Sequence, residues 1–530
     1  MHRTAPPLLC GTRLPRALAV VFVAALAAGC DPSEHTTGQG AVVTLLPRAP
    51  EEIDPRHVFD AYGLRVSRLL FASLVTIDPE TLAAVPDLAE AITVESPTVY
   101  VARLRPGLTF ADGTALDAAD VVATFESVRD PKIGSRYART YERIVRMEVR
   151  DRFTVAFHLD APHAPFMTDL ELPILPAEWR SRRIEAPPGR AGAHDTRDGI
   201  GAESGPYLLA SRTASELVLV ENRRWHHGRP RFGRLRLVVI RDDNTRAIRL
   251  SAAGGDFVMN AMPAILLPMF ANTNFVLERA PGIGTTYIGL NLDAPRLGDV
   301  RVRRALLHAI DRPALVRAKL DGYGTLANGW IPPGHWASST DVPAYPFDRD
   351  RAKRLLDEAG LPDPDGDGPK PRARIVLRTN TERSRVSVSN AVAAMWRDIG
   401  LDVDVQPIET ASLLSDLGRG RFEAVLMTVP EVIEPHVLSW FFASDRIPGP
   451  GTEGANRWRL RNPALDAALE RGRATSDLGA RRAAYDDAQR ILGQELPVLP
   501  LWHDDVVLVR RSAFPAVHVP RDARFGGVVR

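Results

Sequence analysis

Apolar and polar residues alternate with a period of two in several short stretches of the chain. Phe153, Val155, Phe157 and Leu159 are separated by polar or small residues, a pattern typical of a strand with one buried face. Residues 42–46 form an apolar run that ends before Pro47, and they predict an early strand. Residues 217–220 are continuously apolar, which predicts a strand buried on both faces.

Other stretches have apolar residues at helical spacing after a residue that can cap a helix. Asp117 precedes residues 118–128, where Val121, Phe125 and Val128 fall on one side. Residues 65–74 and 242–250 are also expected to be helices. Residues 180–201 are rich in Arg, Pro and Gly and predict a loop.

The stretch of residues 289–316 combines these signals. Residues 287–291 predict a strand, and Asp299 then caps a helix whose apolar stripe includes Val302 and Leu306. Asp311 and Pro313 predict the start of a second helix, because proline is tolerated in the first turn. A strand followed by two capped helices is how an α/β lobe would begin.

The second half of the chain continues this alternation of helices and strands. The segments expected to be helices or strands, in order, are 349–359 (helix), 375–378 (strand), 386–399 (helix), 401–406 and 422–429 (strands), 462–469 and 481–492 (helices), and 496–501 (strand). Strands separated by helices of this length predict βαβ units in an α/β fold. A chain of 530 residues also exceeds what one hydrophobic core supports, so we expect at least two lobes.

The N-terminus has the pattern of an export signal. Basic residues come first, and residues 18–28 form an apolar run that is too short to span a membrane. The run ends in Leu-Ala-Ala-Gly-Cys, which resembles a bacterial lipobox with Cys30 as the lipidated residue. The polar residues 31–40 would then be a tether. The only other cysteine, Cys10, lies in the signal, so the mature chain can form no disulfide framework.

The composition and net charge of the chain indicate which classes of protein it can belong to. The chain is 45% hydrophobic and 25% charged, which is ordinary for a globular protein, and its net charge is +2. Such a small net charge predicts no nucleic-acid partner.

Several motifs together carry a resemblance to a known family. Residues 291–312 read N-x-x-x-P-x-x-x-D-x-R-V-R-x-A-x-x-x-A-I-D-R, residues 85–90 read V-P-D-L-A-E, and residues 104–114 read L-R-P-G-L-T-F-A-D-G-T. Residues 205–207 read G-P-Y, and residues 496–501 read L-P-V-L-P-L. In this order they resemble the family 5 solute-binding proteins of ABC importers, the peptide- and nickel-type binding proteins.

The resemblance implies a two-lobed α/β periplasmic-binding-protein fold, large and type II-like. It implies a signal peptide over 1–30, a tether over 31–40, a first lobe over 41–280 plus 489–530 with a subdomain at about 75–196, and a second lobe over 281–488. Such a protein performs no chemistry and needs no cofactor. It captures a peptide or other small solute and delivers it to an ABC permease of the inner membrane. We expect a monomer, held by its lipid anchor on the periplasmic side of the cell envelope.

The resemblance also indicates ligand contacts. Relatives that bind peptides carry an Asp that pairs with the peptide's amino terminus, and Glu431 stands at that position here. Glu434 matches a second acidic position. Asn291 and Trp440 lie on segments that border the cleft in the family. His436 could bind a metal, as in the nickel-binding relatives.

Two other functions stay open. A hydrolase is disfavoured because the chain has no G-x-S-x-G, no H-E-x-x-H and no phosphate-binding Gly-rich loop followed by Lys-Ser/Thr. A binding lobe that has become an envelope sensor or adaptor is the other alternative.

We expect no resident metal. His226 and His227 are adjacent, and on a strand they would point to opposite faces. The acidic loop that begins at Asp363 has Arg374 where a calcium loop needs Glu.

Overall fold

The computed structural model describes residues 40–58, 60–182, 184, 200–366, 368–449, 452 and 454–529. Val42–Arg530 form one compact unit. The expected signal peptide, Cys30, most of the tether and most of the loop at 180–201 lie outside the described residues. No helix of the described part is both long and apolar enough to cross a membrane.

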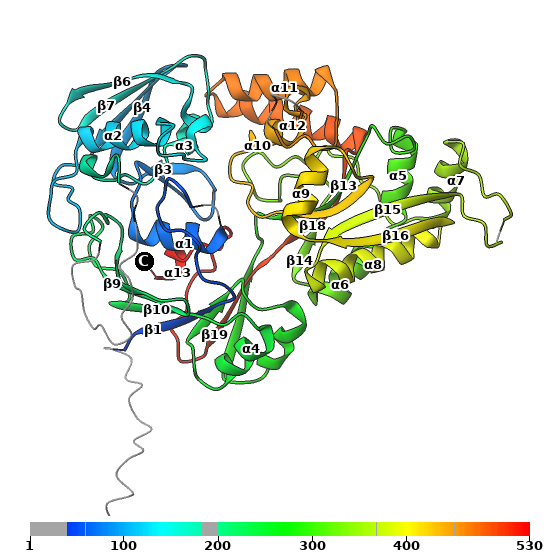
Figure 1. The fold of residues 1–530 in the computed structure, drawn as a ribbon, viewed down its shortest axis with the longest axis horizontal. Coiled ribbons are helices and arrows are strands. Elements are labelled where there is room, and N and C mark those ends of the chain that lie inside the picture. The colour runs from blue at the N-terminus through cyan, green and yellow to red at the C-terminus, as the bar shows by residue number, and fades with distance from the viewer. Residues whose placement is uncertain are drawn as a thin grey trace, which may run out of the picture. The chain divides into compact units, whose positions relative to one another are not determined.

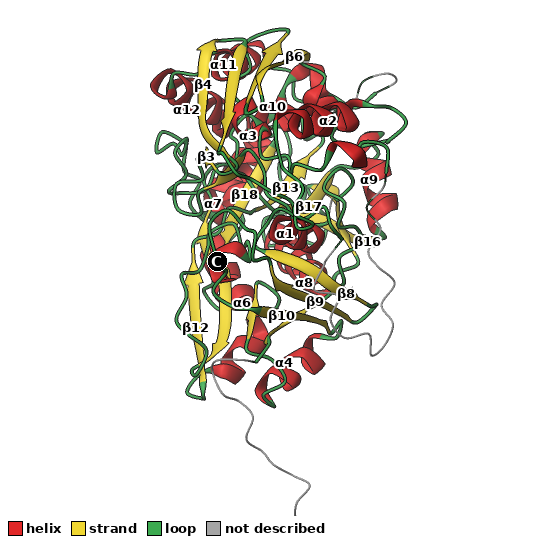
Figure 2. Ribbon diagram, turned by 90° about the vertical axis from the view of Figure 1, so that its left-hand side faces the viewer, coloured by secondary structure: helices red, strands yellow, loops and turns green. Residues whose placement is uncertain are grey.

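A seven-stranded sheet contains the first and the last strand of the described chain (Figures 1 and 2). Its strands, in spatial order, are β12 (Phe275–Ala280), β19 (Val506–Arg511), β11 (Phe257–Met259), β1 (Val42–Leu46), β10 (Arg234–Val239), β9 (Glu216–Glu221) and β8 (Tyr207–Arg212). β1 has the predicted bounds and pairs in parallel with β10 and β11. In β9, Leu217 and Leu219 are buried and Val218 is partly exposed, so the prediction of a strand buried on both faces is wrong.

Helices α1 (Ala61–Leu70) and α4 (Asp243–Ser251) pack on this sheet through separate apolar clusters. α1 begins earlier than predicted because the side chain of Asp60 accepts hydrogen bonds from the backbone N–H groups of Tyr62 and Gly63. It ends at Leu70, so the helix expected over 65–74 is displaced by about one turn.

A four-stranded antiparallel sheet is inserted into this part of the chain. It runs β4 (Ala89–Ser96), β5 (Val99–Leu104), β7 (Thr154–Leu159) and β6 (Ile144–Asp151), after a small ribbon of β2 (Val75–Ile77) and β3 (Ala84–Pro86). Helix α2 (Ala118–Arg129) packs on it (Figure 1), with the Phe125 and Phe157 rings 5.0 Å apart. Asp117 and Asp120 form a capping box that starts α2 as predicted. The shorter helices here are η1 (Ala138–Tyr141), α3 (Phe166–Asp169) and η2 (Ala177–Trp179).

The third large sheet has six strands. They are β14 (Gly324–Leu326), β18 (Val498–Asp504), β13 (Thr285–Leu290), β17 (Ala424–Val429), β15 (Ala373–Asn380) and β16 (Leu401–Ile408). β15, helix α8 (Arg383–Arg397) and β16 form the predicted parallel βαβ unit. α5 (Val300–His308) and α6 (Arg312–Leu320) begin after Asp299 and Asp311, as predicted. They share an apolar core with α7 (Arg349–Glu358) and α8.

A second apolar cluster on this sheet is formed with helices that follow β16 in the chain. These are α9 (Thr410–Gly418), α10 (Val437–Phe442), α11 (Pro463–Ala474) and α12 (Leu478–Glu495). Trp458 lies in this cluster, fully buried against Gly289 of β13, where a Cβ would meet the indole at 1.9 Å. The remaining short helices are η3 (Ala264–Phe270), η4 (Ser444–Arg446) and α13 (Gly526–Val529).

The chain passes between the seven- and six-stranded sheets twice. It passes through residues 281–284 between β12 and β13, and through Asp505 between β18 and β19. β18 pairs with β13 and β14, so the chain returns to the seven-stranded sheet only after Asp504, later than the boundary expected at residue 489.

Candidate ligand-binding site

The expected ligand contacts lie at two ends of one strand pair. β13 and β17 are antiparallel, with Thr285 opposite Val429 and Leu290 opposite Ala424. Glu431, Glu434 and His436 follow β17, whereas Asn291 follows β13 at the far end of the pair. The structure therefore does not bring Asn291 together with the acidic loop of residues 430–436.

Asn291 is buried and engaged by backbone groups. Its Nδ2 donates to the carbonyl oxygens of Gly420 and Phe422, at 3.0 and 2.9 Å, and its Oδ1 accepts from the N–H of Asp293. These bonds hold the end of β13 to the loop that precedes β17.

Trp440 on α10 is 41% exposed, with the Arg446 guanidinium 5.9 Å from its ring centroid, so its ring is accessible.

Glu434 is held by protein partners. Its Oε1 lies 2.5 Å from Arg481 Nη2 of α12 and also accepts from the N–H of His436, while Thr168 Oγ1 lies 3.4 Å from its Oε2. Burial raises the pKa of Glu434, and the positive charge of Arg481 opposes that rise. The carboxylate thus joins the loop after β17 to α12 and to the segment of α3.

His436 packs edge-to-face against His163, with ring centroids 5.8 Å apart. Burial and the nearby positive charges of His163, Arg473 and Arg481 lower the pKa of His436 to about 3. The imidazole is therefore neutral at ordinary pH. Surroundings that disfavour an imidazolium also disfavour a bound metal cation.

Glu431 lies in the same loop as Glu434, but the two carboxylates differ in whether a protein group binds them. Its side chain is partly buried, and within the described part of the chain its carboxylate has no hydrogen-bond or ion-pair partner. Ile433, two residues on, packs against Ile77 and Leu82. Glu431 is thus a carboxylate without a protein partner, and its charge acts on Arg524 and Asp522, two residues that line a cavity.

That cavity has a volume of about 200 Å³. Its walls come from α1, from β2 and the loop after it, and from the C-terminal segment of residues 520–527. Charged groups line it beside apolar ones. The charged lining residues are Arg65, Arg68, Asp78, Asp87, Glu171, Asp522 and Arg524.

An ion-pair network forms one side of the cavity. Glu171 Oε2 lies 3.1 Å from Arg524 Nη2 and 3.4 Å from Arg68 Nη2, and Asp522 Oδ2 lies 2.9 Å from Arg524 Nε. Burial alone would raise the pKa of Glu171, but the charges of Arg524 and Arg68 bring it below its usual value. Burial opposes ionisation of Arg524, yet Glu171, Asp522 and, more weakly, Glu431 raise its pKa.

The two arginines of α1 have donors that the network does not use. The Nε and Nη1 groups of Arg65 and the Nη1 group of Arg68 are buried and lack an acceptor among the described residues. Buried guanidinium donors without an acceptor are costly and are satisfied by an anion such as a carboxylate. Sequence reasoning missed these arginines because nothing in the sequence around α1 distinguishes them from other surface cations.

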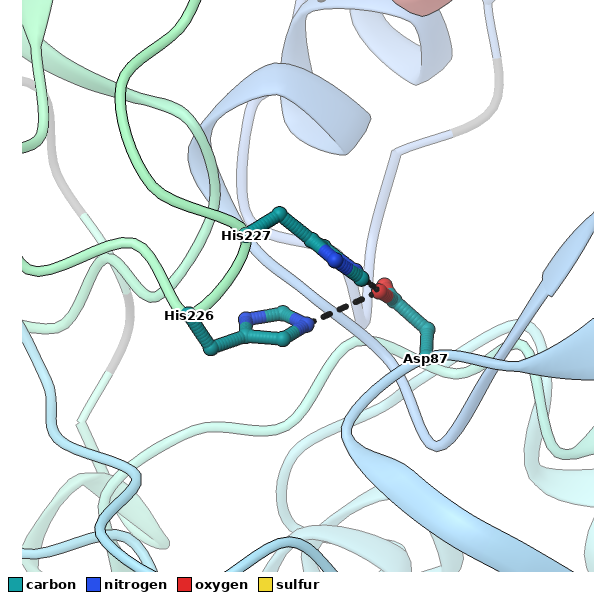
Figure 3. Close-up of side chains that lie close together, drawn as sticks. All are labelled: Asp87, His226 and His227. Atoms are coloured by element: carbon teal, nitrogen blue, oxygen red, sulfur yellow. Dashed lines mark hydrogen bonds and ion pairs between the residues drawn. The ribbon is translucent and has the colours of Figure 1, made fainter.

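Asp87, which lines the cavity, also meets two histidine side chains (Figure 3). His226 and His227 both point toward Asp87. The two histidines lie in a turn after β9, not in a strand, so the opposite-face geometry considered for adjacent residues does not apply.

Comparisons with known proteins agree with this architecture. The model of the bacterial extracellular solute-binding proteins, family 5 Middle, matches residues 83–447. A glutathione-binding protein, GsiB of Shigella dysenteriae serotype 1, is 26% identical over 483 residues, covering 89% of this chain and 91% of that protein. The oligopeptide-binding protein AppA from Bacillus subtilis, in complex with a nonapeptide, superposes with a TM-score of 0.74 at 23% identity, covering 92% of this chain and 97% of AppA. NikZ from Campylobacter jejuni, in complex with Ni(L-His), gives a TM-score of 0.73 at 22% identity, covering 90% and 95%.

Proposed function

Because this chain belongs to the bacterial extracellular solute-binding proteins of family 5, we propose that it captures a peptide or peptide-like solute and delivers it to an ABC permease. The family match over residues 83–447 is the observation that carries the proposal. GsiB is named for glutathione, which is itself a small peptide, and AppA was solved with a nonapeptide. The solute would be enclosed between a lobe built on the seven-stranded sheet and a lobe built on the six-stranded sheet.

The charges at the cavity support a solute with both a cationic and an anionic end. Glu431 offers a carboxylate without a protein partner, suited to an ammonium group. Arg65 and Arg68 offer buried donors suited to a carboxylate. An unblocked peptide carries both groups. Of the five residues expected from the sequence, Glu431 and Trp440 are the ones that we propose as contacts, since Glu434, Asn291 and His436 are engaged or enclosed by protein.

We place the protein on the periplasmic side of the envelope, anchored through a lipidated Cys30, with residues 31–40 as the tether. A single lipid-bearing N-terminus would keep the binding unit near its permease without constraining its fold.

A ligand screen by thermal unfolding tests the proposal. The purified protein would be mixed with dipeptides, oligopeptides, glutathione, sugars, opines and metal chelates. Because a solute binds only the folded state, a hundredfold excess over Kd stabilises the protein by ~2.7 kcal/mol. We expect peptides to raise the Tm. N-acetylation and C-amidation of a peptide that raises the Tm should each reduce that rise. A folded protein that no class stabilises would count against solute binding and would favour the sensor or adaptor alternative.

A further inference from the structure

Asp87, His226 and His227 bring three metal-ligating atoms together (Figure 3). Asp87 Oδ1 lies 3.0 Å from His226 Nε2 and 2.7 Å from His227 Nε2. The ring centroids of the two histidines are 4.1 Å apart. Within the described residues, these are the only three His, Cys, Asp or Glu side chains that meet in this way.

The backbone fixes all three residues in place. The turn that carries the histidines is closed by N–H donation from Trp225 to the Asn222 carbonyl and from Gly228 to the Trp225 carbonyl. Gly228 has a φ of 94°, which favours glycine there. The Trp225 indole packs 5.2 Å from the His227 ring. The turn, unlike a strand, lets two successive side chains reach the same carboxylate.

Asp87 is equally constrained. It lies in the short connection between β3 and β4, where its N–H donates to the Leu74 carbonyl and its own carbonyl accepts from Arg105 Nε at 2.8 Å. Its side chain is 4% exposed and that of His226 is 9% exposed, whereas that of His227 is 42% exposed. Asp87 is therefore buried, His226 is partly buried, and His227 faces solvent.

We propose that Asp87, His226 and His227 bind a divalent transition-metal ion of the zinc class. Two imidazole nitrogens and one carboxylate oxygen are ligands that Zn²⁺ accepts, with the fourth position taken by solvent or a small anion at the exposed side. Tetrahedral bonds of ~2.1 Å place neighbouring ligand atoms ~3.4 Å apart. The observed separations of 2.7 and 3.0 Å need only a small outward rotation of the imidazoles to reach that value.

This site shares Asp87 with the lining of the cavity, whereas His226 and His227 are not among the residues that line it. It requires no solute, and it would bind the metal ion itself rather than a metal chelate. The ion would join the turn after β9 to the connection before β4, and so hold the inserted four-stranded sheet to the seven-stranded sheet.

Zn²⁺ binding to chelator-stripped protein tests the site. Equilibrium dialysis should find one tightly bound Zn²⁺ per chain, and Co²⁺ substitution should give the visible ligand-field bands of a four-coordinate site. His227→Gln, at the exposed ligand, should keep the fold and weaken Zn²⁺ binding at least ~10-fold, and His226→Gln should do the same. His518→Gln is the matched control, because His518 pairs with a single exposed carboxylate, that of Glu80.

The Co²⁺ spectra and the Zn²⁺ affinities of the variants either support the metal site or rule it out. Loss of the Co²⁺ bands in His226→Gln and His227→Gln, with the bands intact in His518→Gln, supports the site. Zn²⁺ stoichiometry and affinity that are unchanged in both variants would show that the three side chains form only a hydrogen-bonded cluster. Circular dichroism of each variant confirms that the comparison is between folded proteins.

Discussion

Gly282 lies so close to Asp504 that a Cβ on Gly282 would come 2.1 Å from the Asp504 carbonyl oxygen. Gly282 lies in the first segment that passes between the seven- and six-stranded sheets, and Asp504 is the last residue of β18, directly before the second such segment. A glycine is therefore required where the crossing segments approach each other, because the neighbouring atom is backbone and cannot move aside as a side chain would.

Gly282→Ala should destabilise the protein by roughly 1–3 kcal/mol or more, the usual cost of overpacking a close contact. Urea unfolding measures the difference. Gly233→Ala is the control, because a Cβ there meets no atom within 4 Å, and it should not lower stability. Equal stability of the two variants would contradict a close approach at Gly282.

The Glu434–Arg481 pair predicts a second stability effect. Arg481→Met should leave the Glu434 carboxylate without its cation in a setting where the two side chains are only 18% and 10% exposed. A buried charge that loses its partner destabilises by roughly 3 kcal/mol. Chemical denaturation at neutral pH measures it, with Arg482→Met as the control on the exposed neighbouring residue. Equal losses in the two variants would mean that the ion pair contributes nothing.

His335 should make stability depend on pH. Its Nδ1 accepts from the N–H of Ala337, and its Nε2 donates to the Ile433 carbonyl, so the neutral imidazole satisfies both partners. Burial, with the charges of Arg521 and Arg481, lowers the pKa of His335 to about 4. The unfolded chain has a value of about 6.5, so it binds more protons and stability falls as the pH drops below that value.

Between pH 7 and pH 5, His335 alone should cost on the order of 2 kcal/mol of folding stability. His335→Gln removes this term, so the stability gap between wild type and variant should narrow as the pH falls. Urea unfolding at both pH values measures the gap. The exposed-site variant His518→Gln should track wild type, and a pH-independent gap for His335→Gln would refute the assignment.

Glu431→Gln should weaken binding of an unblocked peptide about tenfold or more, since a hydrogen bond to a charged group contributes roughly 1.5–3 kcal/mol. N-acetylated peptide should bind wild type and Glu431→Gln alike, because it lacks the ammonium group. Calorimetric titration measures both. Glu142→Gln, at an exposed carboxylate, is the control. Unchanged affinity for the unblocked peptide would remove Glu431 from the site.

Cys30→Ser should release the protein from the membrane fraction, because the acyl-bearing thiol is lost. Cys10→Ser changes the only other cysteine and should stay membrane-bound. Fractionation of cells followed by immunoblotting measures the distribution. A Cys30→Ser protein that partitions like wild type would exclude lipidation at Cys30.

Helix starts could be predicted from the sequence where a capping residue contacts backbone groups only a few residues away. Asp117, Asp299 and Asp311 start the helices that they were expected to start, because a capping side chain bonds backbone groups of its own first turn. The α1 start was misplaced because the Asp60 cap lies upstream of the apolar residues that suggested the helix. β9 was expected to be buried on both faces, but the sheet and its neighbours decide which faces of a strand are covered.

The sequence by itself determined the α/β class, the βαβ unit around α8, the family resemblance and the acidic loop after β17. Each depends on residues close together in the chain or on motifs in a fixed order. Only the tertiary structure decided that Glu434 is paired while Glu431 is available, that Asn291 lies at the other end of its strand pair, and that Arg68, Glu171 and Arg524 meet. It also brought Asp87 to His226 and His227 across 139 and 140 residues. Such contacts depend on how the sheets assemble, because charge pairing and burial are set by neighbours in space rather than in sequence.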